Sequence, residues 1–271
     1  MKYADLHIHT KFSDGTFTPE RVVKEAGKEG LSCIAITDHD QVSGIEPAQN
    51  CAVDFAIEVV PGVELSAEID NCEIHILGYF IDWRQDWFRD RLRQICDARK
   101  RRALAIIERL KTQGINLEPA QVFGLAGTGA VGRLHIARIL KREGLVQSIQ
   151  EAFNKYIGNG QPSYVKKFKL TVAEAIDMIR KLKGLAVLAH PHTINDSGLI
   201  PELVRLGLRG IEVYYPGYAP ATTKHYENLA REYGLLLSGG SDCHGLSKNK
   251  ASIGEVKIPY SLVEVMKREN G

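Results

Sequence analysis

Short apolar runs alternate with amphipathic segments at the start of the chain and again in its last third. The run Cys33-Ile34-Ala35-Ile36-Thr37 is almost wholly apolar, which is typical of a parallel strand buried on both faces. Thr18-Pro19-Glu20 predicts a helix that begins after an N-cap threonine, and Thr171-Val172-Ala173-Glu174 predicts a second helix that begins with a capping box. The pattern predicts strands at 3–9, 33–37, 56–60, 73–79, 186–189, 210–214 and 235–238, and helices at 18–28, 45–53, 171–183 and 220–233.

The middle of the chain has a different character. One long helix with an apolar stripe is predicted over 86–111, and no strand pattern interrupts the segment that follows it. Shorter helices are predicted near 119–125, 132–142 and 148–156. We therefore predict an all-helical insertion at 86–165 that contributes to substrate binding, within a discontinuous domain formed by 1–85 and 166–271.

Strand–helix alternation on both sides of the insertion predicts the fold class. Polar residues gather just after the apolar runs, and barrel enzymes carry their chemistry at the C-terminal ends of their strands. The pattern therefore favours an α/β fold, a TIM-like (β/α) barrel with an inserted helical subdomain. A doubly wound parallel sheet is the alternative.

Composition sets limits on function. The chain has 271 residues, 44% of them hydrophobic, which permits a large core, and a net charge of +2 gives no general argument for a nucleic-acid or membrane binder. The cysteines lack C-x-x-C spacing, so we expect Cys33, Cys51, Cys72 and Cys96 to be reduced and mostly buried. Without a signal sequence or a bilayer-length apolar run, we expect a cytoplasmic protein with no membrane partner and no obligate protein partner.

Side chains of metal-ligand type follow the apolar runs. His7 and His9 are two residues apart on one strand, so they share a face, and Asp5 on that face is expected to orient an imidazole. Further candidate ligands lie on separate segments: Asp14, His39, Glu64, His75, His190, Asp242 and His244. Mixed imidazole and carboxylate ligands suit zinc, manganese or iron(II) better than calcium or magnesium.

We predict three catalytic residues, namely Asp38, His39 and Glu64. Asp38 and His39 directly follow a buried strand, and we expect Asp38 to orient His39 or to handle protons. Glu64 lies in an apolar stretch, where a lone carboxylate is costly unless it is paired or binds a metal. Because a carboxylate can bridge two cations, Glu64 is the best bridging candidate. The pair Gly239-Gly240 is expected to let the backbone approach a metal or a phosphate closely.

The insertion carries a candidate substrate site. Arg133 and His135 lie at the start of a predicted helix, and a helix N-terminus with such side chains nearby can bind an anion. Lys167 and His192 are further candidates for substrate binding.

Taken together, the motifs resemble the PHP family, which is named for its polymerase-associated and histidinol phosphatase members. They are D-L-H-x-H-T at 5–10, S-D-G at 13–15, T-D-H-D at 37–40, P-G-V-E at 61–64, A-H-P at 189–191 and S-D-x-H at 241–244. The R-x-H-I-A segment at 133–137 resembles the stand-alone phosphoesterases of the family, which act on nucleoside 3′,5′-bisphosphates and, in some members, on 5′-phosphorylated RNA.

The resemblance implies a distorted (β/α)7 barrel, the PHP fold, with two to three divalent metal ions. It assigns the ligands in three sets: His7, His9, Glu64 and Asp242; Asp14, His39 and His244; and Glu64, His75 and His190. Other members carry a histidine at the position of Asp14. Oxygen in place of nitrogen favours manganese, with iron or zinc as alternatives.

We therefore predict a metal-dependent phosphoesterase that releases the 3′-phosphate of a nucleoside 3′,5′-bisphosphate, with short 5′-phosphorylated RNA as a further substrate. Histidinol-phosphate phosphatase is an alternative within the family. An amidohydrolase or deaminase, whose barrel also opens with H-x-H, would normally lack the Asp38-His39 pair and Glu64. A non-catalytic PHP module would have lost ligands that this chain retains.

Overall fold

The computed structural model describes residues 1–69, 72–127, 131–166, 170–194, 197–248 and 253–270. The chain divides into two compact units, which we call the barrel unit (Met1–Arg89 with Lys169–Gly271) and the helical unit (Asp90–Phe168). None of the helices in the described part of the chain combines the length and apolar character that a bilayer-spanning segment requires.

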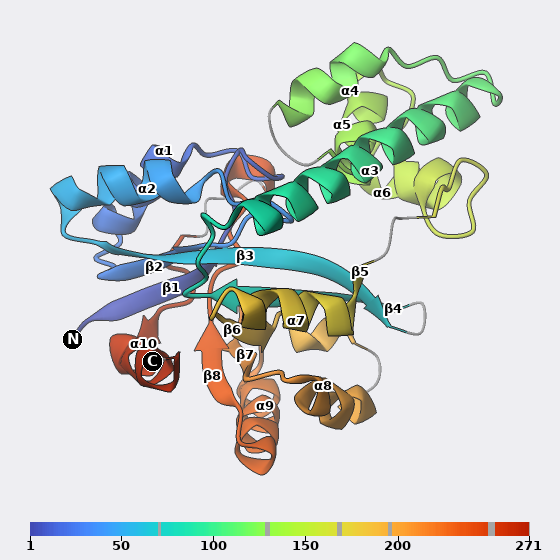
Figure 1. Cartoon of the computed structure of the whole chain (residues 1–271). Helices are drawn as coiled ribbons and strands as arrows, with labels where there is room; N and C mark the ends of the chain where they lie inside the picture. Colours follow the sequence, from blue (N-terminus) through green and yellow to red (C-terminus); the bar gives the residue numbers. More distant parts are fainter. Residues whose placement is uncertain (70–71, 128–130, 167–169, 195–196, 249–252, 271) are drawn as a thin grey trace. The chain divides into compact units, whose positions relative to one another are not determined.

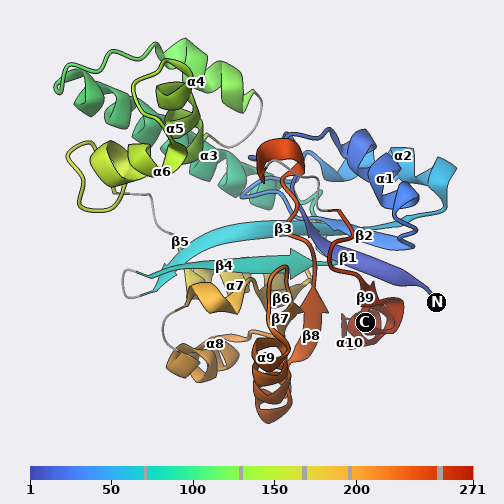
Figure 2. The ribbon, with the colours of Figure 1, turned by 180° about the vertical axis from the view of Figure 1, so that it is seen from behind.

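The barrel unit is built on a mixed sheet with the strand order β8-β7-β6-β4-β3-β2-β1-β9, and β5 pairs with β3 (Figure 1). The strands are β1 (Tyr3–Ile8), β2 (Cys33–Ile36), β3 (Glu58–Ile69), β4 (Cys72–Tyr79), β5 (Leu170–Thr171), β6 (Leu185–Leu188), β7 (Gly210–Tyr214), β8 (Leu236–Gly239) and β9 (Ile258–Pro259). Strands β1 to β3 are parallel, as are β6 to β8, whereas β4 is antiparallel to both of its neighbours. Figure 2 shows β6, β7 and β8 beside one another.

The sheet nearly closes into a barrel because the segment after β8 returns to β1. Cys243 pairs with Ile8, its carbonyl accepts the N–H of His9 at 2.9 Å, and its N–H donates to the carbonyl of His7 at 3.3 Å. A side chain at Gly240 would place its Cβ 2.4 Å from the backbone nitrogen of His7, so the close approach requires glycine. The predicted TIM-like barrel fold is thus confirmed, in a distorted form.

The main difference from the predicted elements is at β3. The prediction of a strand ending at residue 60 was wrong, because β3 continues through Pro61-Gly62 to Ile69 and forms a hairpin with β4. Within it, Glu64 pairs with Leu77. Two strands therefore follow each other without a helix between them, and Glu64 lies within a strand. Alternation along β3 turns its carboxylate away from its apolar neighbours Val63 and Leu65.

Helices cover the outside of the sheet. They are α1 (Pro19–Lys28), α2 (Ile45–Ala52), α7 (Val172–Lys181), α8 (Ile200–Leu206), α9 (Pro220–Tyr233) and α10 (Tyr260–Asn270), with short 3-10 turns η1 (Val53–Phe55), η3 (Pro191–Thr193), η4 (Ser197–Leu199) and η5 (Gly245–Lys248). The predicted helix starts are confirmed: Thr18 Oγ1 accepts the N–H of Arg21, and Thr171 and Glu174 form a capping box. Side chains such as Leu6, Ala35, Leu77 and Val187 belong to one buried core of the barrel unit.

The helical unit has a core of its own. It contains most of α3 (Asp86–Lys111), together with α4 (Pro119–Ala126), α5 (Arg133–Arg142), α6 (Ile149–Ala152) and the π-helical turn η2 (Phe153–Ile157). Leu110, Ile136, Ile139 and Leu140 are fully buried within it. The apolar stripe of a single helix becomes buried by packing against the neighbouring helices.

The cysteines are free but less buried than expected. Of the four outside the candidate site, only Cys33 is buried, whereas Cys72 is exposed and Cys51 and Cys96 are partly exposed. Cys72 is the first residue of β4 and pairs with Ile69, the last residue of β3, at the end of the hairpin where one strand passes into the other, which explains its exposure.

Candidate metal centre

The predicted ligands come together at one end of the barrel unit although they lie far apart in the sequence. His7 lies in β1, Glu64 in β3 and His75 in β4. The others lie in loops that follow strands: His9 and Asp14 after β1, His39 after β2, His190 after β6, and Asp242 and His244 after β8.

Four of these side chains converge on one point. The Nε2 atoms of His7 and His9 lie 3.1 Å apart, and Glu64 Oε2 lies 3.2 Å from the first and 3.1 Å from the second. Asp242 Oδ1 lies 3.5 Å from His7 Nε2 and 3.1 Å from His9 Nε2. Ligands bound to one ion at normal bond lengths are separated by roughly 2.8–3.6 Å, so these atoms fit a single cation.

The Glu64 carboxylate lies at the centre of the cluster and is fully buried. Its Oε2 atom also lies 3.1 Å from Nδ1 of His39. Its Oε1 atom lies 2.8 Å from Nδ1 of His75 and 3.0 Å from Nε2 of His190. Each oxygen thus faces its own set of imidazole nitrogens, which is the arrangement that a bridging carboxylate needs.

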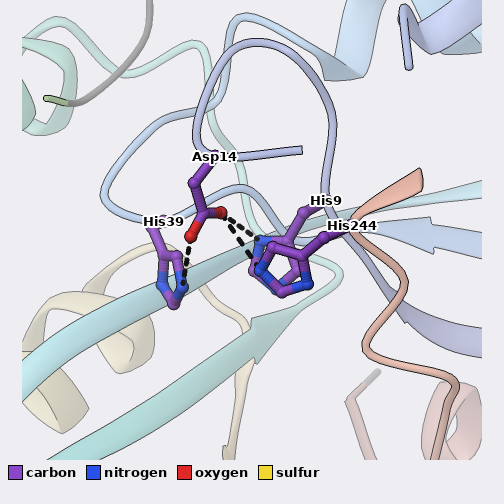
Figure 3. Close-up of side chains that lie close together, drawn as sticks. All are labelled: His9, Asp14, His39 and His244. Atoms are coloured by element: carbon purple, nitrogen blue, oxygen red, sulfur yellow. Dashed lines mark ion pairs between the residues drawn. The ribbon is translucent and has the colours of Figure 1, made fainter. Parts of the chain in front are cut away.

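A second group of four can hold another cation. His9, Asp14, His39 and His244 each offer a ligand atom, and these atoms all lie within 4.8 Å of one another. Figure 3 shows the Asp14 carboxylate between the rings of His39 and of His9 and His244. Asp14 Oδ1 is 3.1 Å from His244 Nε2, and Asp14 Oδ2 is 4.0 Å from His39 Nε2.

Two buried atoms in this region favour a cation. Asp14 Oδ1 and His39 Nδ1 are buried and lack a hydrogen-bond partner of normal geometry. Leaving such atoms unsatisfied costs roughly 1–3 kcal/mol each, and coordination of a cation would satisfy both. The residues present therefore fit a metal cluster.

The groups in the structure overlap more than the sets implied by the motifs. His39 contributes to the group around Asp14 and also to a group with Glu64 and His75. One of its nitrogens faces Glu64 and the other faces Asp14.

The backbone is strained at two of the candidate ligands. His190 has a φ of 27° and Asp242 a φ of 49°, in a region that residues other than glycine rarely adopt. Such conformations cost about 1–3 kcal/mol and occur at functional sites, where the surrounding structure holds them.

Without a cation, protons on the imidazoles balance the buried carboxylates. Burial by itself would lower the pKa of His9, but hydrogen bonds to Asp242 and Glu64 raise the pKa to about 10. Burial also opposes protonation of His75, but the Glu64 carboxylate raises its pKa to about 9. Although burial would raise the pKa of Glu64, the imidazoles around it hold this pKa well below its usual range.

Glu212, in β7, is a site residue that was not predicted from the sequence. It is fully buried, and its carboxylate accepts a hydrogen bond from Nδ1 of His7 at 2.9 Å and from the backbone N–H of His190 at 2.7 Å. The orienting role expected of Asp5 was wrong. The Asp5 carboxylate accepts backbone N–H groups, of which those of Ser241 and Gly254 lie closest, and so it holds the loops that follow β8.

Asp38 also forms hydrogen bonds with the loop beside the site. Its carboxylate accepts hydrogen bonds from the N–H of Thr10 at 2.7 Å, from Thr10 Oγ1 at 2.6 Å and from Ser13 Oγ at 2.5 Å. Ser13 Oγ in turn lies 3.5 Å from Nδ1 of His9. These contacts fix the loop that carries Asp14. They support a positioning role, and the predicted proton-handling role stays a prediction.

The predicted substrate residues have different surroundings. His135 is buried, and its Nδ1 atom accepts the N–H of Gly132, so this ring caps its own helix, which argues against contact with a substrate. Arg133 is partly exposed, donates to Ile157 O at 3.3 Å and to Asn159 Oδ1 at 3.1 Å, and helps to line a small cavity in the helical unit.

Of the two remaining substrate candidates, only His192 lies within the described part of the chain. Lys167 falls outside the described residues. His192 is exposed, follows the candidate ligand His190 by two positions, and contacts Tyr218.

Two further details concern the loop after β8. We expected Gly239 and Gly240 to let the backbone approach a metal or a phosphate, but they let strands approach each other. A Cβ atom at Gly239 would clash with Tyr214, and one at Gly240 would clash with His7. The Cys243 thiol is buried and accepts the N–H of Gly245, which is consistent with a structural role between the candidate ligands on either side.

Comparisons with known proteins agree with this geometry. The PHP domain family matches residues 5–79. The chain is 38% identical over 249 residues to the 5'-3' exoribonuclease Rnm of Escherichia coli (strain K12), covering 89% of this chain and 84% of that protein. It is 31% identical over 274 residues to the 3',5'-nucleoside bisphosphate phosphatase of Chromobacterium violaceum, covering 95% and 92%.

The fold has a solved counterpart. The crystal structure of a protein from Bifidobacterium adolescentis assigned as a metal-dependent phosphoesterase superposes with a TM-score of 0.87 and 28% sequence identity, covering 97% of this chain and 94% of that one. The chain therefore belongs to the PHP family and is a metal-dependent phosphoesterase.

Proposed function

We propose that this protein releases the 3′-phosphate of nucleoside 3′,5′-bisphosphates and also acts on short RNA with a 5′-phosphate. The observation that carries the proposal is the Glu64 carboxylate, whose two oxygens face separate sets of imidazole nitrogens. A cluster of that size can hold two or three cations, as hydrolysis of a phosphate ester by adjacent metals requires. The names of the two relatives support nucleotides as the substrate class.

We propose manganese as the resident metal, with iron and zinc as alternatives. His7, His9, Glu64 and Asp242 would hold one ion, and Asp14 with its histidine neighbours a second. The carboxylate oxygen of Asp14 within a set of imidazoles favours manganese or iron over zinc. When bound, such ions lower the pKa of water and neutralise phosphate oxygens.

The chain's own residues prepare this chemistry in three ways. His7, whose Nδ1 donates to Glu212, presents Nε2 to the cluster in a fixed tautomer. Asp38 holds the loop that positions Asp14. Arg133 in the helical unit would bind the phosphate that is not cleaved. Its side chain is partly exposed at the start of a helix, and an arginine in such a position can bind an anion.

A phosphate-release screen tests the substrate class. Purified protein loaded with manganese is incubated with adenosine 3′,5′-bisphosphate, histidinol phosphate and a 5′-phosphorylated trinucleotide, and inorganic phosphate and mononucleotide are measured. We expect the bisphosphate to be cleaved with the highest kcat/KM. A preference for histidinol phosphate would overturn the proposal and support the alternative within the family.

An arginine variant tests the second phosphate. We expect Arg133→Ala to lower kcat/KM for adenosine 3′,5′-bisphosphate by about ten-fold or more, and to affect adenosine 3′-monophosphate much less. Arg142→Ala, at the other end of the same helix, is the matched control. Equal effects of Arg133→Ala on the two substrates would remove this role.

A further inference from the structure

Three aromatic rings lie together beside the metal centre, and we call them the ring cluster: His192, Tyr215 and Tyr218. The His192 ring lies 5.1 Å from that of Tyr215 and 5.3 Å from that of Tyr218, and the two tyrosine rings lie 5.4 Å apart. They come from the segments that follow β6 and β7, the same end of the barrel unit that carries the candidate ligands.

The polar edges of the rings are already held by the protein. The Tyr218 hydroxyl forms a hydrogen bond of 2.8 Å with Nδ1 of His192, and Tyr215 donates to Oδ2 of Asp242 at 2.7 Å. Tyr226 packs behind Tyr218 with ring centroids 5.5 Å apart. The ring cluster is therefore fixed in place before any ligand arrives, which lowers the entropic cost of binding to it.

The ring cluster reaches both the metal centre and the solvent. The ring of the candidate ligand His190 lies 6.0 Å from that of Tyr215 and 6.2 Å from that of His192. His192 is exposed, and Tyr215 and Tyr218 are partly exposed. Because these partly exposed rings lie so close to the metal centre, one nucleoside is long enough to reach from the metal centre to the ring cluster.

We propose that the ring cluster is the surface on which the base of the substrate stacks while its 3′-phosphate lies at the metal centre. This inference rests on the proposed function and adds a base-binding site to it. Stacking on aromatic rings contributes about 1–3 kcal/mol per base and tolerates any base, because every base has a π-face. The protein should therefore prefer a nucleotide to the same phosphate without a base, with little selection among bases.

Equilibrium binding tests the site without relying on turnover. Calorimetry on the metal-loaded protein compares adenosine 5′-monophosphate with ribose 5-phosphate, which lacks the base. We expect the nucleotide to bind about ten-fold more tightly or better. Tyr218→Ala should reduce this ratio to near one, while Tyr218→Phe, which keeps the ring, should preserve most of it. Tyr233→Ala, at the C-terminal end of α9, is the control.

Kinetics give a second readout. We compare adenosine 3′,5′-bisphosphate with the same sugar bisphosphate without the base. Tyr218→Ala and His192→Ala should raise KM far more for the substrate that carries the base. The thermal midpoint and the metal content of both variants should match those of Tyr233→Ala. Equal binding of adenosine 5′-monophosphate and ribose 5-phosphate by the wild-type protein, or an unchanged ratio in Tyr218→Ala, overturns the inference. If the bisphosphate is not cleaved at all, the proposed function fails, and the binding ratio still decides on the base site.

Discussion

His7 and Glu212 form a hydrogen bond in the interior of the barrel unit, with Nδ1 of the imidazole 2.9 Å from Oε1 of the carboxylate and both side chains fully buried. The other Glu212 oxygen accepts the backbone N–H of His190. One carboxylate therefore fixes the tautomer of a candidate ligand in β1 and holds the strained backbone of another after β6. A ligand that is oriented in this way binds metal more strongly.

We predict that Glu212→Ala lowers metal affinity by roughly 10–100-fold. The loss follows because His7 can then turn or change tautomer, and because the N–H of His190 loses its partner. Glu212→Gln should have a smaller effect, since its amide oxygen can still accept from His7. The measurement is a competition titration of manganese and zinc against a chelator.

Glu232→Gln, an exposed carboxylate on α9, serves as the control for the loss of charge. Wild-type affinity in Glu212→Ala would show that the hydrogen bond has no part in holding the metal. Reduced affinity with an unchanged unfolding midpoint would separate this role from general stability.

The central place of Glu64 leads to a prediction about metal stoichiometry. Its oxygens face residues of more than one group, whereas Asp14 belongs to one group only. We expect Glu64→Gln to lose more than one equivalent of metal per chain after dialysis and to be inactive. Asp14→Asn should lose at most one equivalent. Elemental analysis of the two proteins, with Glu264→Gln as a surface control, tests this, and equal losses would contradict a bridging Glu64.

Bound metal should remove the pH dependence of stability that the metal-free protein shows above about pH 6.5. In the metal-free protein, His9 and His75 have pKa values of about 10 and about 9, well above the unfolded value near 6.5. Their stabilising effect is complete below about pH 6.5 and is lost as the pH rises through the folded values, by about 1.4 kcal/mol per pH unit for each group. Bound metal replaces these protons and removes the loss.

Urea unfolding at pH 7, 8 and 9 measures this effect, once with a chelator present and once with saturating metal. The free energy of unfolding should fall with pH only in the chelated samples. A fall of the same size in both would mean that the imidazoles are not the groups that exchange protons for metal.

Much of the metal centre could be predicted because residues of metal-ligand type at the ends of apolar runs indicate a metal site from the sequence alone. His7, Glu64 and His190 each follow or interrupt a buried strand, and strand ends on one side of a sheet meet. Glu212 carried the same signal as Glu64, a carboxylate inside an apolar run. Because a buried charge in a strand needs a partner, this signal could have identified Glu212 as a site residue.

Other features depend on tertiary contacts that no local pattern encodes. The acceptor role of His135 depends on which ring nitrogen turns back to its own helix. Asp5 shares a face with His7 but lies opposite the loops after β8, so it bonds to their backbone. The hairpin of β3 was hidden because Pro61-Gly62 is more typical of a break than of a continuing strand.

Asp38 offers a test that separates positioning from proton transfer. Asparagine at this position can still accept from Thr10 and Ser13, so Asp38→Asn should keep its metal and lose less than about ten-fold in kcat, whereas a proton-handling carboxylate would lose about 10²–10⁴-fold. Asp38→Ala leaves buried donors without a partner, at about 1–3 kcal/mol each, and should release the loop that carries Asp14.

A substitution at Gly44 tests the same positioning role of Asp38 without changing Asp38 itself. A Cβ atom at this position would lie 2.5 Å from Oδ2 of Asp38, so Gly44→Ala should displace the carboxylate without changing its charge. We expect Gly44→Ala to resemble Asp38→Ala, with weaker metal binding and a lower unfolding midpoint. If Asp38→Asn instead loses almost all activity while its metal content and midpoint stay normal, the carboxylate transfers protons, and its contacts with Thr10 and Ser13 are secondary.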